Sequence, residues 1–275
     1  MTHSIIDSWV VPNPPEISRL WPEHLAHVFR VFRREHMLAG TTVDEFLITM
    51  DEAGIGASIL TGLVEDSFVI SNDDVAAWVA EAPTRLFGRA CVDPRKPSAA
   101  LAELRRAVED LGFRSLQVLP YAFGLPFSHR IYYPLYAACV EYGIPVVTQV
   151  GHTASLMPSD PGRPIYLDDV ALDFPDLVIV GGHIGWPWTS EMIALALKHP
   201  NVYIETSGHL PRRYPDEFVD FLKGPGAEKC LFGTDWPWID PVRAVAQVGD
   251  LGLSADAESK FMSENAARVF GLTLP

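Results

Sequence analysis

The chain has 275 residues and a formal net charge of −14, from 35 acidic against 21 basic side chains. It is 48% hydrophobic and 20% charged, which is typical of a globular protein with a large buried core. The acidic balance argues against nucleic acid as a main partner, because phosphate binding needs clustered Lys and Arg. No apolar run approaches the roughly 20 residues of a membrane span, so we expect no membrane partner.

The first residues and the cysteines indicate the compartment. The segment Met1-Thr2-His3-Ser4 lacks the basic stretch and apolar core of a signal peptide. Cys91, Cys139 and Cys230 lie far apart, each inside an apolar segment, and they indicate buried thiols rather than disulfides or a CxxC metal site. We therefore predict a cytoplasmic protein. The oligomeric state is left open, and a homo-oligomer is compatible with the sequence.

Short apolar runs alternate with amphipathic stretches along the chain, the pattern of βα units around a parallel sheet. The first strand is followed by a Pro-rich loop and by a stretch rich in basic and aromatic residues near 29–36. A helix then begins after Thr42 as N-cap, with Glu45 in the capping-box position, and ends at Gly54. Strands are predicted at 4–11, 57–61, 86–92, 114–119, 144–150, 177–181, 201–206 and 229–232. The later helices are predicted at about 72–82, 99–111, 131–142, 167–174, 190–198, 215–222, 241–248 and 255–270.

Eight strands, each followed by a helix, within about 250 residues predict an α/β fold of the (β/α)₈ barrel type. We expect it to be a single domain covering residues 1–275. The strands lack strict alternation, as expected when both of their faces are buried. A doubly wound open sheet is the alternative, but no GxGxxG motif follows the first strand.

Chemistry in such a barrel is placed where the strands run out into the following loops. His152 follows the fifth strand, His183 the sixth and Asp235 the eighth. A set of this kind can ligate a divalent metal, or it can position and deprotonate a water without one. We predict that all three are catalytic, and that they are also the metal ligands if a metal is bound.

Each of these residues also has a structural explanation. His152 fits a loop histidine that caps a carbonyl group, and Asp235 fits the N-cap of a short helix. We favour catalysis for Asp235 because a carboxylate beside Trp236 is poorly solvated and suited to act as a base. His183 follows two glycines that let the backbone approach another group closely, and for this reason we favour a functional role for His183 as well.

Other residues after the strands are candidates for substrate binding. An arginine can bind a substrate carboxylate through two parallel hydrogen bonds. A position on a solvent-exposed loop accounts for the presence of His209 and Arg213 equally well. Tryptophan rings at the barrel mouth would form one wall of a pocket or only cover the barrel. The full set of predicted substrate-binding residues is Trp9, Gln149, Arg163, Trp186, His209, Arg213 and Trp236.

Several segments resemble the amidohydrolase-related family, in the branch that contains aminocarboxymuconate-semialdehyde decarboxylase, aromatic-acid decarboxylases and a pyrone-dicarboxylate lactonase. They are Gly-Gly-His-Ile-Gly-Trp-Pro at 181–187, Leu-Phe-Gly-Thr-Asp-Trp-Pro at 231–237 and Glu-Asn-Ala-Ala-Arg-Val-Phe-Gly-Leu at 264–272. Three further segments, at 112–117, 133–136 and 201–207, look similar too. The resemblance covers nearly the whole chain and implies the barrel fold. By the same resemblance, His183 matches the histidine of the sixth strand and Asp235 the metal-ligating or basic aspartate of the eighth. His152 or Gln149 takes the place of the histidine on the fifth strand.

The first strand departs from the family pattern. The family usually carries Asp-x-His-x-His there, and the two histidines share one face of the strand. This chain keeps Asp7 but has Trp9 and Val11 at the two histidine positions. An indole cannot ligate Zn²⁺ and would fill the space of the metal. We therefore favour a site with no tightly bound metal, with a divalent metal such as zinc as the alternative.

These observations lead to three functional hypotheses. The first is a hydrolase of a small cyclic carboxylated compound of the lactone type. In it, Asp235 is the general base, His183 polarises the carbonyl with help from His152, and Arg213 or Arg163 holds the carboxylate. The second is a metal-dependent decarboxylase of an aromatic or dienoic acid. The third is a catalytically inactive barrel that binds a small ligand or a partner.

Overall fold

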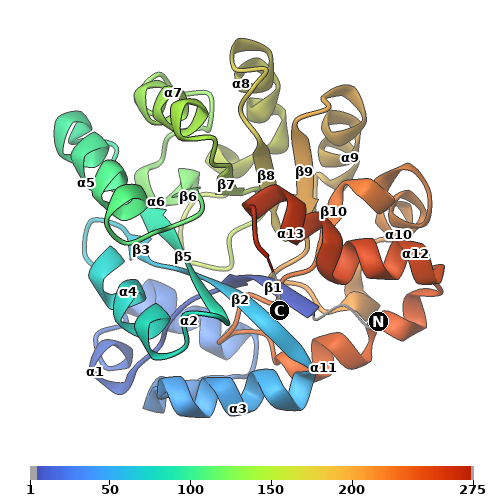
Figure 1. The fold of residues 1–275 in the computed structure, drawn as a ribbon, viewed down its shortest axis with the longest axis horizontal. Coiled ribbons are helices and arrows are strands. Elements are labelled where there is room, and N and C mark those ends of the chain that lie inside the picture. The colour runs from blue at the N-terminus through green and yellow to red at the C-terminus, as the bar shows by residue number, and fades with distance from the viewer. Residues whose placement is uncertain (1–4, 274–275) are drawn as a thin grey trace.

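The computed structural model describes residues 5–273, and its centre is a closed ring of eight parallel strands (Figure 1). The ring closes where the Ser8 amide donates to the Phe232 carbonyl over 3.1 Å and the Val11 amide donates to the Trp236 carbonyl over 2.8 Å. The predicted (β/α)₈ barrel is confirmed, and position 4 of the predicted first strand lies outside the described residues. The strands are neighbours in chain order: β1 Ile5–Val10, β2 Ile55–Thr61, β5 Leu86–Cys91, β6 Leu116–Val118, β7 Val146–Gln149, β8 Ile179–Gly182, β9 Val202–Glu205 and β10 Cys230–Leu231.

Helices surround the strand ring (Figure 1). Thr42 and Glu45 form the predicted capping box at the start of the first large outer helix, α3. No helix within residues 5–273 has the length and apolarity needed to cross a bilayer. The outer helices are α3 Val43–Ala53, α4 Asn72–Glu81, α5 Pro97–Glu109, α7 Tyr133–Tyr142, α8 Leu167–Asp173, α9 Thr189–Lys198, α10 Asp216–Lys223 and α11 Pro241–Ala246. A short helix, α6 Pro120–Phe123, follows β6, and the expected last helix is α12 Ala255–Ser259, a π-helical turn Lys260–Glu264 and α13 Asn265–Phe270.

The segment between β1 and α3 is more ordered than the Pro-rich pattern predicts. It forms α1 Pro15–Ser18, α2 Glu23–Val31 and a 3₁₀ helix over Glu35–Ala39. Phe29 of α2 packs against Trp238, in the loop after β10, with ring centroids 5.6 Å apart. Arg34 forms an ion pair of 3.0 Å with Asp240 of the same loop. These contacts hold α2 over the carboxyl end of the barrel.

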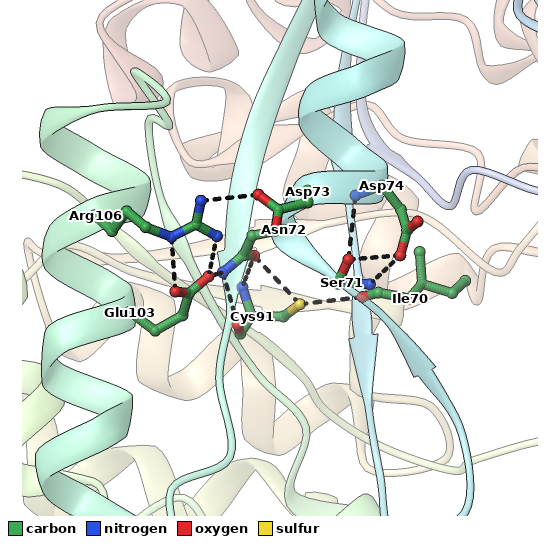
Figure 2. Close-up of polar contacts among 8 residues, drawn as sticks. All are labelled: Ile70, Ser71, Asn72, Asp73, Asp74, Cys91, Glu103 and Arg106. Carbon is green, nitrogen blue, oxygen red and sulfur yellow. Dashed lines mark hydrogen bonds and ion pairs between the residues drawn. The ribbon is translucent and has the colours of Figure 1, made fainter.

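A polar network joins the end of β5 to α4 and α5 (Figure 2). The Asn72 side chain accepts from the Cys91 amide over 2.9 Å and donates to Glu103 over 2.7 Å, and Arg106 donates to the same Glu103. The Cys91 thiol donates to the Ile70 carbonyl of a small hairpin, β3 Leu63–Val64 and β4 Val69–Ile70. Burial raises the pKa of this thiol to about 12. All three cysteines are free and buried, which matches the prediction for them.

Candidate functional site

A cavity of about 870 Å³ lies at the carboxyl end of the barrel. Its walls come from the loops after the strands and from α2. Eight of the ten candidate residues line it: Trp9, Gln149, His152, His183, Trp186, His209, Arg213 and Asp235. The topology therefore brings together side chains that are more than 200 positions apart in the sequence.

The other two candidates lie elsewhere. Trp236 is 1% exposed and packs outside the barrel against Phe46 of α3, with ring centroids 4.6 Å apart. Arg163 forms a two-point ion pair with Glu191 of α9, with a closest distance of 2.6 Å. Neither of them lines the cavity, so the structure does not support substrate contact for either residue. Trp238 takes the place at the wall that was predicted for Trp236.

Backbone strain is concentrated at this cavity. Within residues 5–273, the non-glycine residues with positive φ are Arg33 (57°), His183 (62°), Ile184 (51°) and Asp235 (68°). Side-chain-bearing residues rarely adopt this left-handed conformation, and it is found mainly where the surrounding structure imposes it. Three of the four residues line the cavity. Strain of this kind is often stored at functional sites.

Asp235 is a partly buried carboxyl group on the cavity floor. Its backbone is fixed to β1, because the Asp235 amide donates to the Trp9 carbonyl over 2.9 Å. Burial raises the pKa of Asp235 well above its usual value, and the nearby carboxyl groups of Glu205 and Asp7 raise it further. The group therefore favours its protonated form and can act as an acid.

His183 faces the cavity and is supported from behind by the chain after β9. Its Nδ1 lies 2.9 Å from the Ser207 carbonyl oxygen and 2.8 Å from the Ser207 hydroxyl. Burial lowers the pKa of His183 to about 4, so the ring is neutral near pH 7. His209 is also neutral, because burial lowers its pKa to about 3. His152 is exposed, and its ring lies edge-on to Trp186 at 5.6 Å.

The Trp9 indole occupies the cavity floor where a metal would need ligands from the first strand. Its ring centroid lies 4.8 Å from that of His183, and the Arg89 guanidinium stacks on the indole at 4.9 Å. A side chain at Gly182 would come within 2.6 Å of the indole, so this glycine makes room for it. Among residues 5–273, no group of three His, Cys, Asp or Glu is placed to hold a metal ion. The predicted ligand set of His152, His183 and Asp235 is therefore not assembled.

The rim of the cavity is cationic although the protein is acidic. Arg33, Arg212, Arg213 and Arg243 line it, and their side chains are exposed. None of the four has an acidic partner within the described chain, and Asp235 is the only acidic lining residue there. Unpaired guanidinium groups around a recessed site favour anionic ligands.

Several lining residues were missed by the sequence-based prediction. Leu25 and Val28 of α2 and Phe32, directly after it, form an apolar wall, and Arg33 and Arg243 belong to the rim. The helix was detectable, because Leu25, Val28, Phe29 and Phe32 recur at helical spacing. No sequence signal shows that this helix folds back over the barrel mouth.

Comparison with known proteins places this chain in a family. The family model described as Amidohydrolase matches residues 21–272, so the chain belongs to that family. It is 23% identical over 301 residues to a gamma-resorcylate decarboxylase of Polaromonas sp. strain JS666, covering 92% of this chain and 91% of the relative. A gamma-resorcylate decarboxylase of Rhodococcus jostii is 25% identical over 254 residues, covering 74% and 75%.

Solved structures share the fold. An uncharacterized TIM-barrel protein of Bordetella bronchiseptica has a TM-score of 0.83 and 26% identity, covering 98% of both chains. A dihydroxybenzoic acid decarboxylase of Polaromonas sp. JS666, with bound manganese and the inhibitor 2-nitroresorcinol, has a TM-score of 0.73 and 19% identity, covering 98% and 97%. The named relatives favour the decarboxylase hypothesis over the lactone hydrolase that was placed first from the sequence.

Proposed function

We propose that this member of the amidohydrolase family decarboxylates a small aromatic carboxylic acid, with Asp235 as the proton donor. The observation that supports this most directly is that Asp235 and His183, both held at positive φ, face one cavity with a cationic rim. The named relatives that are decarboxylases of aromatic acids point to the same class of reaction.

The charge distribution fits an anionic acid as substrate. The rim arginines attract the carboxylate, and guanidinium groups bind carboxylates through two parallel hydrogen bonds. The apolar wall formed by Leu25, Val28 and Phe32 fits an aromatic ring and the uncharged product. Inside the barrel, the fully buried Arg89 adds a fixed positive charge below the Trp9 indole.

The reaction requires a proton at the ring carbon that bears the carboxylate. Asp235 transfers its proton to that carbon, the bond to the carboxyl carbon breaks, and its electron pair returns to the ring as CO₂ leaves. Water then reprotonates the Asp235 carboxylate, so each turnover consumes one proton and releases one CO₂. The raised pKa of Asp235 keeps the acid in the protonated form that this step needs.

The residues present do not fit a metal centre of the kind expected for the family. Trp9 and Val11 stand at the two strand-one histidine positions, both are buried, and both line the cavity. His152 is exposed and does not join His183 and Asp235 in a ligand group. We derive no step through a metal, and in this proposal the rim arginines bind the carboxylate.

The proposal is tested by measuring CO₂ release from a panel of aromatic acids. It includes 2,6-dihydroxybenzoate, the ligand named for one structural neighbour. We expect turnover that survives removal of metals by a chelator. Asp235→Asn should lower kcat by about 10² to 10⁴ while the fold is kept. A lactone panel run in parallel tests the hydrolase hypothesis: lactone cleavage without CO₂ release would overturn the proposal in favour of hydrolysis. A protein inert to every compound but stabilised by one of them would indicate a binding protein.

A further inference from the structure

A buried chain of hydrogen bonds runs from His183 into the barrel interior. The Ser207 hydroxyl, 2.8 Å from His183 Nδ1, donates to Glu205 Oε2 over 2.5 Å. The Ser207 amide donates to the other oxygen, Oε1, over 3.0 Å. Ser207 and Glu205 are both fully buried, so no bulk water competes for these bonds.

This arrangement determines which nitrogen of His183 carries the proton. The Ser207 carbonyl can only accept a hydrogen bond, and it lies 2.9 Å from Nδ1. The Ser207 hydroxyl has its proton directed at Glu205 and so presents a lone pair to the same nitrogen. Nδ1 is therefore the donor. In the neutral ring Nε2 then carries the lone pair, and it has no hydrogen-bonding partner among residues 5–273.

We propose that Ser207 and Glu205 are positioning residues that hold His183 with its Nε2 lone pair toward the cavity, so that the site selects aromatic acids with a hydroxyl group that donates to Nε2. This inference rests on the proposed function, since it concerns the substrate of the same cavity. His183 and Asp235 then have complementary roles: His183 accepts a hydrogen bond from the substrate, and Asp235 gives a proton to it.

The tautomer is tested first, without any substrate. The full-length protein is labelled with ¹⁵N-histidine, and the His183 signals are assigned by their loss in His183→Phe. At pH 7 we expect a protonated-type shift at Nδ1 and a bare, pyridine-type shift at Nε2. A proton on Nε2 in the wild-type protein would overturn the inference whether or not the protein decarboxylates. The expected tautomer in a protein that releases no CO₂ would leave the inference intact and refute only the proposed function.

The positioning role is tested by substitution. Ser207→Ala removes one of the two acceptors at Nδ1 and the link to Glu205, and Glu205→Gln replaces the carboxyl group that orients the hydroxyl. Each should weaken the hydrogen bond from the substrate hydroxyl to Nε2 and so raise KM about tenfold, with a smaller change in kcat, the size expected for one such hydrogen bond. Each should also weaken the preference for the Nδ1-protonated tautomer in the ¹⁵N spectrum, which the Ser207 carbonyl alone then maintains. Ser207→Thr keeps the hydroxyl and should restore both readouts. Ser190→Ala, an exposed serine that bonds Glu217, is the matched control. An unchanged tautomer preference and an unchanged KM in Ser207→Ala would contradict the role.

The substrate preference is tested by binding, which needs no turnover. Calorimetry compares 2-hydroxybenzoate with 2-methoxybenzoate, which differ in their ability to donate. The wild type should bind the hydroxy acid about tenfold more tightly, and His183→Phe should remove that difference. Equal binding of the two acids by the wild type, or a preference that persists in His183→Phe, would overturn the assignment of Nε2 as the acceptor.

Discussion

If Trp9 and Val11 are what exclude a metal, replacing both with histidine should create a metal site. The two positions lie on one face of β1 and its continuation, and both line the cavity with His183 and Asp235. The two introduced imidazoles, with His183 and Asp235, would supply the four N and O ligands that zinc accepts. We therefore expect Trp9→His/Val11→His to bind zinc where the wild-type protein does not.

The structure also gives the size of the effect. Trp9 is 2% exposed and contacts His183 and Arg89, so its loss should cost about 3 kcal/mol of unfolding free energy. Replacing the buried Val11 with histidine should lower the unfolding free energy by a further amount of about 1 to 3 kcal/mol when no metal is bound. The metal-free variant should thus melt roughly 10 °C or more below the wild type. Zinc at about 1,000 times its Kd should raise the unfolding free energy of the double variant by about 4 kcal/mol.

The assay is thermal melting with and without zinc, together with metal analysis after gel filtration. Trp9→Phe is the control, because it removes the indole and adds no ligand. It should lose stability and gain nothing from zinc. A wild-type protein that retains one metal per chain, and that zinc stabilises as strongly as it stabilises the double variant, would show that Trp9 and Val11 do not exclude a metal.

Three further predictions concern pH and charge. The value of kcat/KM should fall below about pH 4, where His183 is protonated, and should fall again on the alkaline side as Asp235 loses its proton. A rate that rises through the alkaline range would contradict the assignment of Asp235 as the acid. Arg212→Gln/Arg213→Gln should raise KM several-fold with little change in kcat, whereas Arg114→Gln, at the opposite end of β6, should change neither. Burial raises the pKa of Asp7 to about 6 and of Glu205 to about 7. The folded state therefore holds more protons than the unfolded chain between pH 4 and 7. Because of this difference, the melting temperature should fall as pH rises through that range. Differential scanning calorimetry should show a smaller fall in Glu205→Gln, and a melting temperature that rises with pH would show that these carboxyl groups are not protonated in the folded state.

Strand order and the residues after each strand could be predicted because the barrel has a strong local signature. Apolar runs mark buried strands, and parallel strands place all of their carboxyl ends at one mouth. That rule alone brings His183 and Asp235 into one cavity. It does not say which way a side chain leaves the backbone after the strand. Trp236 follows a residue with φ of 68°, and its ring lies against Phe46 outside the barrel.

Long-range polar partners were the part that the sequence could not predict. Arg163 and Arg213 look alike in the sequence, but Arg163 pairs with Glu191, 28 positions away, whereas Arg213 has no acidic partner among residues 5–273. Ser207 and Glu205 lie in the segment 201–207, which resembles the family, but that resemblance assigned neither residue a role. Their role depends on the side chain of His183, which directly follows the neighbouring strand β8, meeting them at hydrogen-bond distance.

The support behind His183 explains how the site can lose metal ligands and keep an ordered imidazole. Metal-ligating histidines usually donate their other N–H to a backbone carbonyl or a carboxylate, and this fixes the ring. His183 has such a partner in the Ser207 carbonyl, with Glu205 behind it. Ring orientation therefore does not depend on a metal at Nε2. With the Trp9 indole and the Arg89 cation filling the floor below, the same fixed lone pair is available to a hydroxyl group of a substrate. A site of this kind needs a donor on its ligand, and a ligand without one would leave the lone pair desolvated and unpaired, which costs binding energy.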